Sequence, residues 1–244
     1  MSQSPAWPHA TGRLRPVIPD RCAPRSVAAF DLDGTLVRGS SFGQFVRLLI
    51  YRSPCRLLSA ALSIPILAPL AVSRRLRRPI GSVFVWLATL GRTEDELRRR
   101  ARTFADWHAG PASGNRIDLA CARLTAHQQA GDRVVVVTAA VDPVASEVVR
   151  ALDIGHVDVL AARLRPILGG WIPEGGRQGA GKVHRLRESG HRLPVAYAYT
   201  DSAHDVPLLL AARRTHAVHP RPRDLRALRA AVPDCTILTM GSLR

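Results

Sequence analysis

Lysine is almost absent from this sequence: of its 35 basic residues, only Lys182 is a lysine and the rest are arginines. Cysteine is scarce too, with four scattered residues and no CxxC pair. That scarcity argues against a structural zinc site or a disulfide framework and favours a reducing, cytoplasmic setting. The first 26 residues contain several prolines and arginines but no apolar run of the kind found in a secretory signal. We therefore expect residues 1–26 to form a loose basic arm.

The charge of the chain is strongly one-sided, at +16 without histidine. An excess of this size favours anionic partners such as phosphate esters, anionic lipid headgroups or nucleic acid. No aromatic-rich RNA motif, zinc finger or helix-turn-helix signature accompanies it, so we expect no specific nucleic-acid partner. With 244 residues, 46% of them apolar, the chain can form one α/β domain with a smaller accessory module.

Apolar strand patterns alternate with helical patterns along most of the chain, which predicts a doubly wound, Rossmann-like parallel sheet of the α/β class. Residues 42–115 interrupt this alternation, look helical, and predict a cap inserted between core segments 27–41 and 116–244. Strands are expected at Val27–Phe30, Arg133–Val137, Val157–Leu160, Val195–Tyr199 and Thr215–Val218, and helices at Pro143–Leu152, Lys182–Glu188 and Val206–Ala212.

Three polar residues are expected at one edge of this sheet. Asp31, Thr138 and Asp201 each stand where a predicted strand ends. The carboxyl ends of strands line the ligand crevice in open α/β sheets, so these side chains are expected to meet. Asp33 follows Asp31 at an interval of two, which points both carboxylates the same way if the backbone stays extended.

Paired carboxylates at such an edge can divide a phosphoryl-transfer reaction between them. Asp31 is predicted to be the nucleophile that forms an aspartyl-phosphate. Asp33 is predicted to protonate the leaving alkoxide and then to activate water. Clustered carboxylates repel one another without a cation, and Asp31, Asp33, Asp201 and Asp205 together make an oxygen-rich site suited to Mg²⁺. Alternatively, Asp205 orients Lys182 or caps the helix that follows it.

The remaining phosphate contacts are assigned to Thr138, through its hydroxyl, and to Lys182, as a compact point charge. Because arginine is used almost everywhere else, the retained lysine indicates a position where a small ammonium is needed. The alternative is a surface lysine that survived by chance. The set predicts a phosphomonoesterase whose substrate is a phosphate monoester.

These residues resemble the haloacid dehalogenase superfamily over residues 27–220. The resemblance implies a Mg²⁺-dependent aspartyl-phosphate mechanism, in which the backbone carbonyl of Asp33 joins Asp31 and Asp201 as metal ligands. The presence of Asp33 makes the chain more similar to phosphatases than to dehalogenating members. The four sequence motifs of the superfamily correspond in this chain to Asp31–Leu36, Val134–Thr138, Lys182 and Asp201–Asp205.

The place of the cap, between the first and second motifs, resembles subfamily IB, which includes phosphoserine phosphatases. Several stretches are more similar still to the phosphatidylglycerophosphatase C family, which also has an apolar cap. The sequence departs from those relatives at Arg177 and Gly181, where they often have Cys and Glu, and at Thr200, where they have Gly. The similar stretches are Ser41–Phe45, Val85–Gly91, Gly169–Trp171 and Tyr199–Leu209.

One uncharged apolar segment, Leu57–Ser73, lies inside the expected cap. Its 17 residues are short for a membrane span, and Pro65 and Pro69 are expected to break a helix there. A single crossing would also put Asp31 and the later motifs on opposite sides of a bilayer. A hairpin with Ile80–Leu90 that dips into one leaflet is favoured, and the alternative is a buried cap core. Flanking arginines stand at Arg47, Arg52, Arg56, Arg74, Arg75, Arg77 and Arg78.

Three functions are compatible with these features. The first is a phosphatase of a phosphorylated lipid headgroup such as phosphatidylglycerophosphate, in peripheral contact with the anionic inner face of the cell membrane. The second is a soluble small-molecule phosphatase, acting for example on phosphoserine or histidinol phosphate. The third is a non-catalytic basic binding module, which the intact acidic motifs disfavour. The later arginines, Arg221, Arg223, Arg226 and Arg229, are expected on a solvated helix face.

Overall fold

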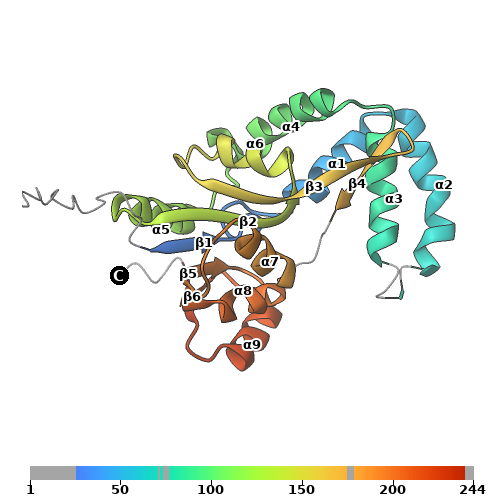
Figure 1. Cartoon of the computed structure of the whole chain (residues 1–244). Coiled ribbons are helices and arrows are strands. Elements are labelled where there is room, and N and C mark those ends of the chain that lie inside the picture. Colours follow the sequence, from blue (N-terminus) through green and yellow to red (C-terminus); the bar gives the residue numbers. More distant parts are fainter. Residues whose placement is uncertain (1–25, 71, 74–76, 175–178, 240–244) are drawn as a thin grey trace, which may run out of the picture.

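The computed structural model describes residues 26–70, 72–73, 77–174 and 179–239. Apart from Ser26, the predicted N-terminal arm lies outside these residues, as does Arg177. The described strands form one seven-stranded sheet in the order β4-β3-β2-β1-β5-β6-β7, and all neighbours pair in parallel except β3 and β4. Helices cover both faces (Figure 1), which confirms the doubly wound α/β class.

The elements are bounded as follows. The strands are β1 (Val27–Phe30), β2 (Arg133–Val141), β3 (Asp158–Ile167), β4 (Gly170–Glu174), β5 (Val195–Thr200), β6 (Ala212–Val218) and β7 (Thr236–Leu238). The α-helices are α1 (Ser41–Tyr51), α2 (Pro54–Leu70), α3 (Arg77–Thr89), α4 (Glu94–Ala109), α5 (Asp118–Gln129), α6 (Val144–Ala151), α7 (Ala180–Glu188), α8 (Val206–Leu210) and α9 (Pro222–Ala231).

The sheet has a separate hydrophobic core on each face, because side chains of successive strand residues point to opposite sides. One core joins Phe30 of β1 to buried side chains of α1, α4, α5 and α6. The other joins Ala29 to Leu186 of α7, Leu208 of α8 and Leu228 of α9. The central strands are therefore covered on both sides, which explains their almost uninterrupted apolar sequence.

Two strands are longer than their sequence pattern predicts. β2 continues past Thr138 to Val141, with an irregular register against β3 between Val137 and Val141. The predicted strand end at Thr138 is therefore wrong. Its pairing with β1 does end at Val136, so Thr138 still lies just beyond the regular part of the ladder.

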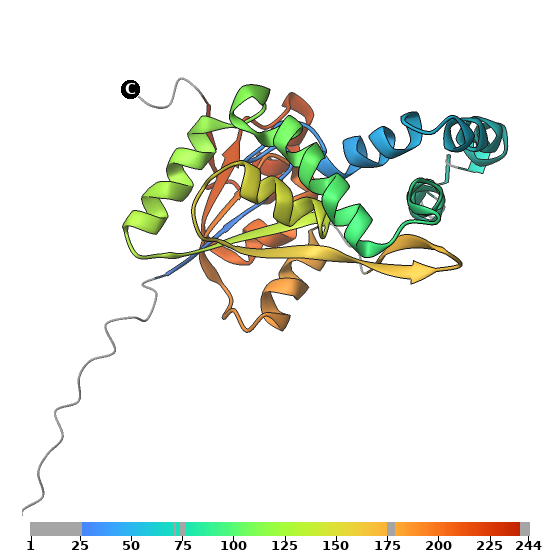
Figure 2. The same cartoon turned by 90° about the horizontal axis from the view of Figure 1, so that it is seen from above.

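β3 also extends beyond the predicted Leu160 to Ile167 and returns as β4 in a hairpin that reaches α3 (Figure 2). The indole N–H of Trp86 in α3 donates to the backbone carbonyl of Ile167 at 3.0 Å, and the indole N–H of Trp171 donates to the backbone carbonyl of Arg92 at 2.9 Å. These bonds tie the hairpin to the inserted helices. Two stretches that are far apart in the sequence, around Trp86 and Trp171, thus form one contact.

The inserted segment is helical, as expected, but its helices have different surroundings. α4 packs on α6 beside the sheet, whereas α2 and α3 stand side by side at the far end, where α3 contacts the edge strand β4 (Figures 1 and 2). The division of the chain into 27–41 plus 116–244 and 42–115 remains a prediction. α2 runs through Pro65 and Pro69, which corrects the expectation that they break the helix. Both prolines are solvent-exposed, and each removes one backbone hydrogen bond, a loss that a helix can accommodate as a kink without ending.

α2 exposes most of its length. Ala60 is its one buried residue among those with described side chains, while Leu58, Leu62 and Ile66 are 61%, 66% and 70% exposed. This observation corrects the alternative of a buried cap core. Among the described residues, no helix is both long enough and apolar enough to cross a membrane.

Aromatic rings stack across three neighbouring strands beneath α5. Phe30 of β1 lies 4.2 Å from Tyr199 of β5, and Tyr199 lies 4.5 Å from His216 of β6, measured between ring centroids. Burial, followed by the positive charge of Arg123 and then His127, lowers the pKa of His216 to about 4. The folded protein therefore holds His216 neutral at pH 7.

Replacing His216 with phenylalanine is expected to make the fold less sensitive to acid. Between the ordinary pKa of 6.5 and the folded value of about 4, the unfolded chain binds a proton that the native protein does not, so stability falls as pH falls through that window. After discounting for partial exposure, the shift is worth about 1 kcal/mol, or about 2–4 °C. The drop in melting temperature between pH 7.5 and pH 5 should therefore be about 2–4 °C smaller in the variant than in the unmodified protein. An equal drop in the two proteins would show that His216 is not the group whose protonation destabilises the fold.

Candidate active site

The predicted catalytic residues line one pocket of about 420 Å³ at the carboxyl edge of the sheet. Asp31 directly follows β1 and Asp201 directly follows β5, which are adjacent strands. Thr138 reaches the pocket from β2, on the other side of β1. Lys182 comes from the first turn of α7. The tertiary structure thus brings together residues that are up to 170 positions apart in the sequence, as the alternating pattern predicts.

Lys182 bridges two carboxylates inside the pocket. Its Nζ lies 2.6 Å from Asp31 Oδ1 and 2.5 Å from Asp205 Oδ2, and all three residues are buried. Burial alone lowers the pKa of a lysine, but here Asp31 and Asp205 outweigh it and raise the pKa of Lys182. The ammonium is therefore charged at neutral pH. The alternative of a chance surface lysine is wrong.

Asp31 offers one free oxygen to the pocket. Its Oδ1 accepts the backbone N–H of Leu32 at 2.8 Å and contacts Lys182. Within the described part of the chain, no side chain or backbone group bonds its Oδ2. Burial raises the pKa of Asp31 well above its ordinary value, with Lys182 acting in the opposite direction. A pocket-lining carboxylate that is held through one oxygen leaves the other oxygen available for attack.

Asp33 is held by the first residue of α1. The hydroxyl and the backbone N–H of Ser41 donate to Asp33 Oδ1, at 2.6 Å and 3.0 Å. Ser40 is the N-cap of this helix and accepts the N–H of Gly43. Burial raises the pKa of Asp33, and the bonds from Ser41 counter it in part. A carboxyl group with a raised pKa retains its proton more readily, which suits a general acid.

Asp201 lies directly against the backbone of the turn after Asp33. A Cβ placed on Gly34 would come within 2.2 Å of Asp201 Oδ2, and Gly34 has a φ of +84°. Glycine is required there for both reasons. Burial raises the pKa of Asp201 to about 6. This close approach places the Asp201 carboxylate beside the Asp33–Gly34 peptide.

Gly34→Ala is expected to lower the hydrolysis of p-nitrophenyl phosphate by about a hundredfold, because the new methyl group displaces the Asp201 carboxylate. Gly131→Ala is the matched control, since Gly131 has a similar φ of +79° and nothing within 4 Å of its added Cβ. Both variants should lose about 1–2 kcal/mol of stability through backbone strain. Equal activity losses in the two would show that strain, and not Asp201, is responsible.

Asp205 contacts protein groups through Oδ2, while its buried Oδ1 has no hydrogen-bond partner among the described residues. Its Oδ2 accepts the hydroxyl of Thr200 at 2.8 Å as well as Lys182. Within the described part of the chain, no three carboxylate, imidazole or thiolate groups gather closely enough to hold one metal ion. The assignment of Asp31, Asp33, Asp201 and Asp205 as metal ligands therefore remains a prediction. Of the alternatives for Asp205, the one that orients Lys182 agrees with these contacts.

A smaller ligand set still fits Mg²⁺. Asp31 and Asp201 follow adjacent strands and both line the pocket, and Asp201 adjoins Gly34, so two carboxylates gather beside the turn that contains Asp33. Burial raises the pKa of both Asp31 and Asp201, which shows that their ionised forms are poorly solvated by the protein alone. A hard cation with oxygen ligands would relieve this penalty.

Thr138 lines the pocket with a hydroxyl group that can donate a hydrogen bond. The Thr138 Oγ1 accepts the backbone N–H of Ala140 at 3.0 Å, which leaves the hydroxyl proton available for a phosphoryl oxygen. Arg185 of α7 donates to the backbone carbonyl of Thr138 at 2.9 Å. The same helix that carries Lys182 therefore also positions this segment of β2.

Several residues around the site have roles that the sequence reasoning did not assign. Ser41 donates a hydrogen bond to Asp33, and Thr200 donates one to Asp205. Arg221 and Arg223 are solvent-exposed at the start of α9, as expected, and both also line the catalytic pocket. The signal for the two arginines was available: they stand in His-Pro-Arg-Pro-Arg, directly after a predicted strand end.

The sequence model of one protein family, the haloacid dehalogenase-like hydrolases, matches residues 28–210 of this chain. This range contains all six predicted site residues. The chain belongs to this family. Its resemblance to the superfamily, and the prediction that it is a hydrolytic enzyme, are thereby confirmed. The family's fold explains why the motifs appear in this order along the chain.

Solved structures share this haloacid dehalogenase-like fold. A protein of unknown function from Bordetella pertussis Tohama I aligns with a TM-score of 0.69 and 23% identity, over 89% of this chain and 99% of that one. A phosphoserine phosphatase, in a structure of its phospho-aspartyl intermediate analogue, gives 0.54 and 17%, over 88% and 94%. Cytosolic 5'-nucleotidase IIIB, bound to cytidine, gives 0.54 and 13%, over 88% and 80%.

Proposed function

We propose that this hydrolase is a Mg²⁺-dependent phosphomonoesterase that acts on the phosphorylated headgroup of a membrane lipid, such as phosphatidylglycerophosphate. The family match and the pocket chemistry support phosphate ester hydrolysis. The observation that carries the lipid substrate is the exposed apolar face of α2, in the same inserted segment as α1, whose Phe42 lines the catalytic pocket.

In this mechanism, Asp31 Oδ2 attacks phosphorus and the bond from phosphorus to the ester oxygen breaks. Asp33 gives its proton to the departing alkoxide, and the phosphoryl group remains on Asp31. Asp33 then takes a proton from a water molecule, whose oxygen attacks the aspartyl-phosphate and releases inorganic phosphate. Lys182 and Thr138 hold phosphoryl oxygens throughout.

Asp31, Asp201 and the backbone carbonyl of Asp33 would hold Mg²⁺. When bound, the ion supplies positive charge that offsets the charge developing on the phosphoryl oxygens. Asp205 keeps the Lys182 ammonium beside Asp31, and Thr200 keeps Asp205 in place. Ser41 sets the direction of the Asp33 carboxyl group.

Membrane contact through α2 accounts for side chains that the fold leaves unburied. Leu58, Leu62 and Ile66 are each more than half exposed, and transfer of such side chains into a lipid interface is favourable. Arg56 lies at the start of the segment and donates to the carbonyl of Leu90 at 2.8 Å. Arg74 and Arg75 lie outside the described residues. We propose a peripheral position at the anionic inner face of the cell membrane.

Placing charges on α2 is expected to detach the protein from lipid. The double variant Leu58→Glu and Leu62→Glu should lose most of its flotation with phosphatidylglycerol vesicles while keeping its hydrolysis of p-nitrophenyl phosphate within twofold. Leu210→Glu is the matched control, because Leu210 is equally exposed, at 66%, but belongs to α8. Flotation that is the same in all three proteins would refute the membrane role of α2.

A second candidate is a soluble small-molecule phosphatase, favoured by the structural likeness to a phosphoserine phosphatase. A panel of monoesters separates the two, with phosphatidylglycerophosphate in detergent compared with phosphoserine and histidinol phosphate in water. The proposal expects the highest kcat/KM for the lipid. A soluble substrate that is preferred by tenfold or more would overturn it.

A further inference from the structure

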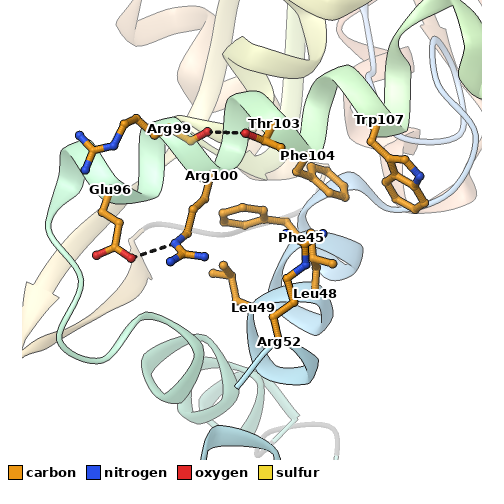
Figure 3. Close-up of a pocket in the computed structure, with 10 residues that line it drawn as sticks. All are labelled: Phe45, Leu48, Leu49, Arg52, Glu96, Arg99, Arg100, Thr103, Phe104 and Trp107. Carbon is orange, nitrogen blue, oxygen red and sulfur yellow. Dashed lines mark hydrogen bonds and ion pairs between the residues drawn. The ribbon is translucent and has the colours of Figure 1, made fainter. Parts of the chain in front are cut away.

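A groove runs between α1 and α4 in the inserted segment (Figure 3). Its volume is about 750 Å³, and its floor is formed by Phe45 and Leu49 of α1 and Phe104 of α4. These three side chains are buried, and the rings of Phe45 and Phe104 lie 5.6 Å apart. Trp107 forms one wall and is 67% exposed. A groove with an apolar floor and an exposed aromatic wall suits an alkyl chain.

The rim of the groove carries an excess of positive charge. Arg52, Arg99 and Arg100 line it, with Glu96 as the single acidic residue. Glu96 is already bound by Arg100 at 2.8 Å and also by Arg92. Arg52 and Arg99 form no ion pair with any residue in the described ranges. The groove therefore complements a ligand that is apolar along its length and anionic at one end.

α1 connects this groove to the catalytic pocket. Phe42, in the first turn of α1, lines the catalytic pocket, and Phe45, one turn later, begins the groove. The groove continues to Arg52, the C-cap of α1, which is about 15 Å further along the helix axis than Phe42. α2, with its exposed apolar side chains, begins at Pro54. A chain lying along α1 would thus lead from α2 toward Asp31.

We propose that the groove between α1 and α4 binds an acyl chain of the phospholipid substrate, whose phosphorylated end lies at Asp31, while Arg52 and Arg99 contact the phosphates of neighbouring lipid molecules. This inference rests on the proposed lipid function and adds the path by which the lipid approaches. The groove and α2 have different roles in this proposal. The exposed side chains of α2 contact the membrane surface, whereas the groove holds a single acyl chain.

Binding can be measured through Trp107. Vesicles of phosphatidylglycerol with brominated acyl chains should quench a component of the fluorescence that is missing in Trp107→Phe. Thr103 is exposed and lines the groove, so Thr103→Phe fills it. This variant should lose at least two thirds of that quenching while floating with vesicles as the unmodified protein does. Full quenching in Thr103→Phe would overturn the inference.

Catalysis provides the second readout. Thr103→Phe and Arg99→Glu should each raise KM for phosphatidylglycerophosphate in detergent at least tenfold, and leave kcat/KM for p-nitrophenyl phosphate within twofold. Arg102→Glu is the control for Arg99→Glu, because Arg102 lies on the same helix, is exposed and does not line the groove. Equal losses on both substrates would overturn the inference.

The two proposals fail in different ways. If the lipid is hydrolysed and Thr103→Phe changes neither its KM nor the quenching, the groove inference is wrong and the proposed function stands. If Thr103→Phe abolishes Trp107 quenching but the unmodified protein releases no phosphate from the lipid, the groove binds acyl chains and the proposed substrate is wrong.

Discussion

Asp31→Asn is expected to lower the release of phosphate from p-nitrophenyl phosphate by at least about a thousandfold. The amide keeps the size of the side chain but has no anionic oxygen to attack phosphorus. Folding should survive, because Lys182 retains its contact with Asp205 and one buried carboxylate is removed. Phosphate release with saturating Mg²⁺ measures the activity, and the melting temperature verifies the fold.

The matched control is Asp118→Asn, which makes the same chemical change at a side chain that is 88% exposed on α5. It should keep full activity. If Asp31→Asn retains a tenth or more of the activity of the unmodified protein, Asp31 is not the nucleophile. The proposed mechanism would then fail whatever the substrate is.

Changes at Lys182 are expected to have the second-largest effect. Lys182→Met leaves Asp31 and Asp205 buried without their common cation, and breaking a buried ion pair from one side costs about 3–5 kcal/mol. The melting temperature should therefore fall by about 6 °C or more. Activity should fall by at least about a hundredfold, because the phosphoryl group loses a fixed positive charge.

Lys182→Arg tests whether a compact ammonium is required. Nζ lies within 2.6 Å of two carboxylate oxygens in a site with almost no solvent access, so a planar guanidinium has to displace Asp31 or Asp205. We expect activity to stay at least about a hundredfold below that of the unmodified protein even if stability is partly restored. Restoration of half the activity or more would show that any cation suffices there.

The sequence by itself determined the fold class and the centre of the site. Apolar runs of a few residues, each followed by Asp or Thr, identify parallel strands, and parallel strands deliver their carboxyl ends to one edge. That rule needs only local patterns, which is why Asp31, Asp201 and Thr138 could be placed together. Lys182 stood out because its chemistry differs from that of the arginines used everywhere else.

The tertiary structure decided the roles of groups whose position depends on long-range packing. Asp205 could have bound a metal, oriented Lys182 or capped a helix, and only the approach of α7 to the turn after β5 shows that it contacts Lys182. Gly179 permits this approach, since an added Cβ would lie 2.3 Å from the carbonyl oxygen of His204. A local pattern contains no information on such an approach.

The inserted segment shows the same division. Its apolar and arginine-rich composition is evident from the sequence. The periodicity of a helix does not show which of its apolar residues pack against other elements. Packing leaves the side chains of Leu58, Leu62 and Ile66 in solvent and opens a groove between α1 and α4. Burial is a property of the assembled elements, so the exposed face of α2 and the groove beside it were decided by the tertiary structure alone.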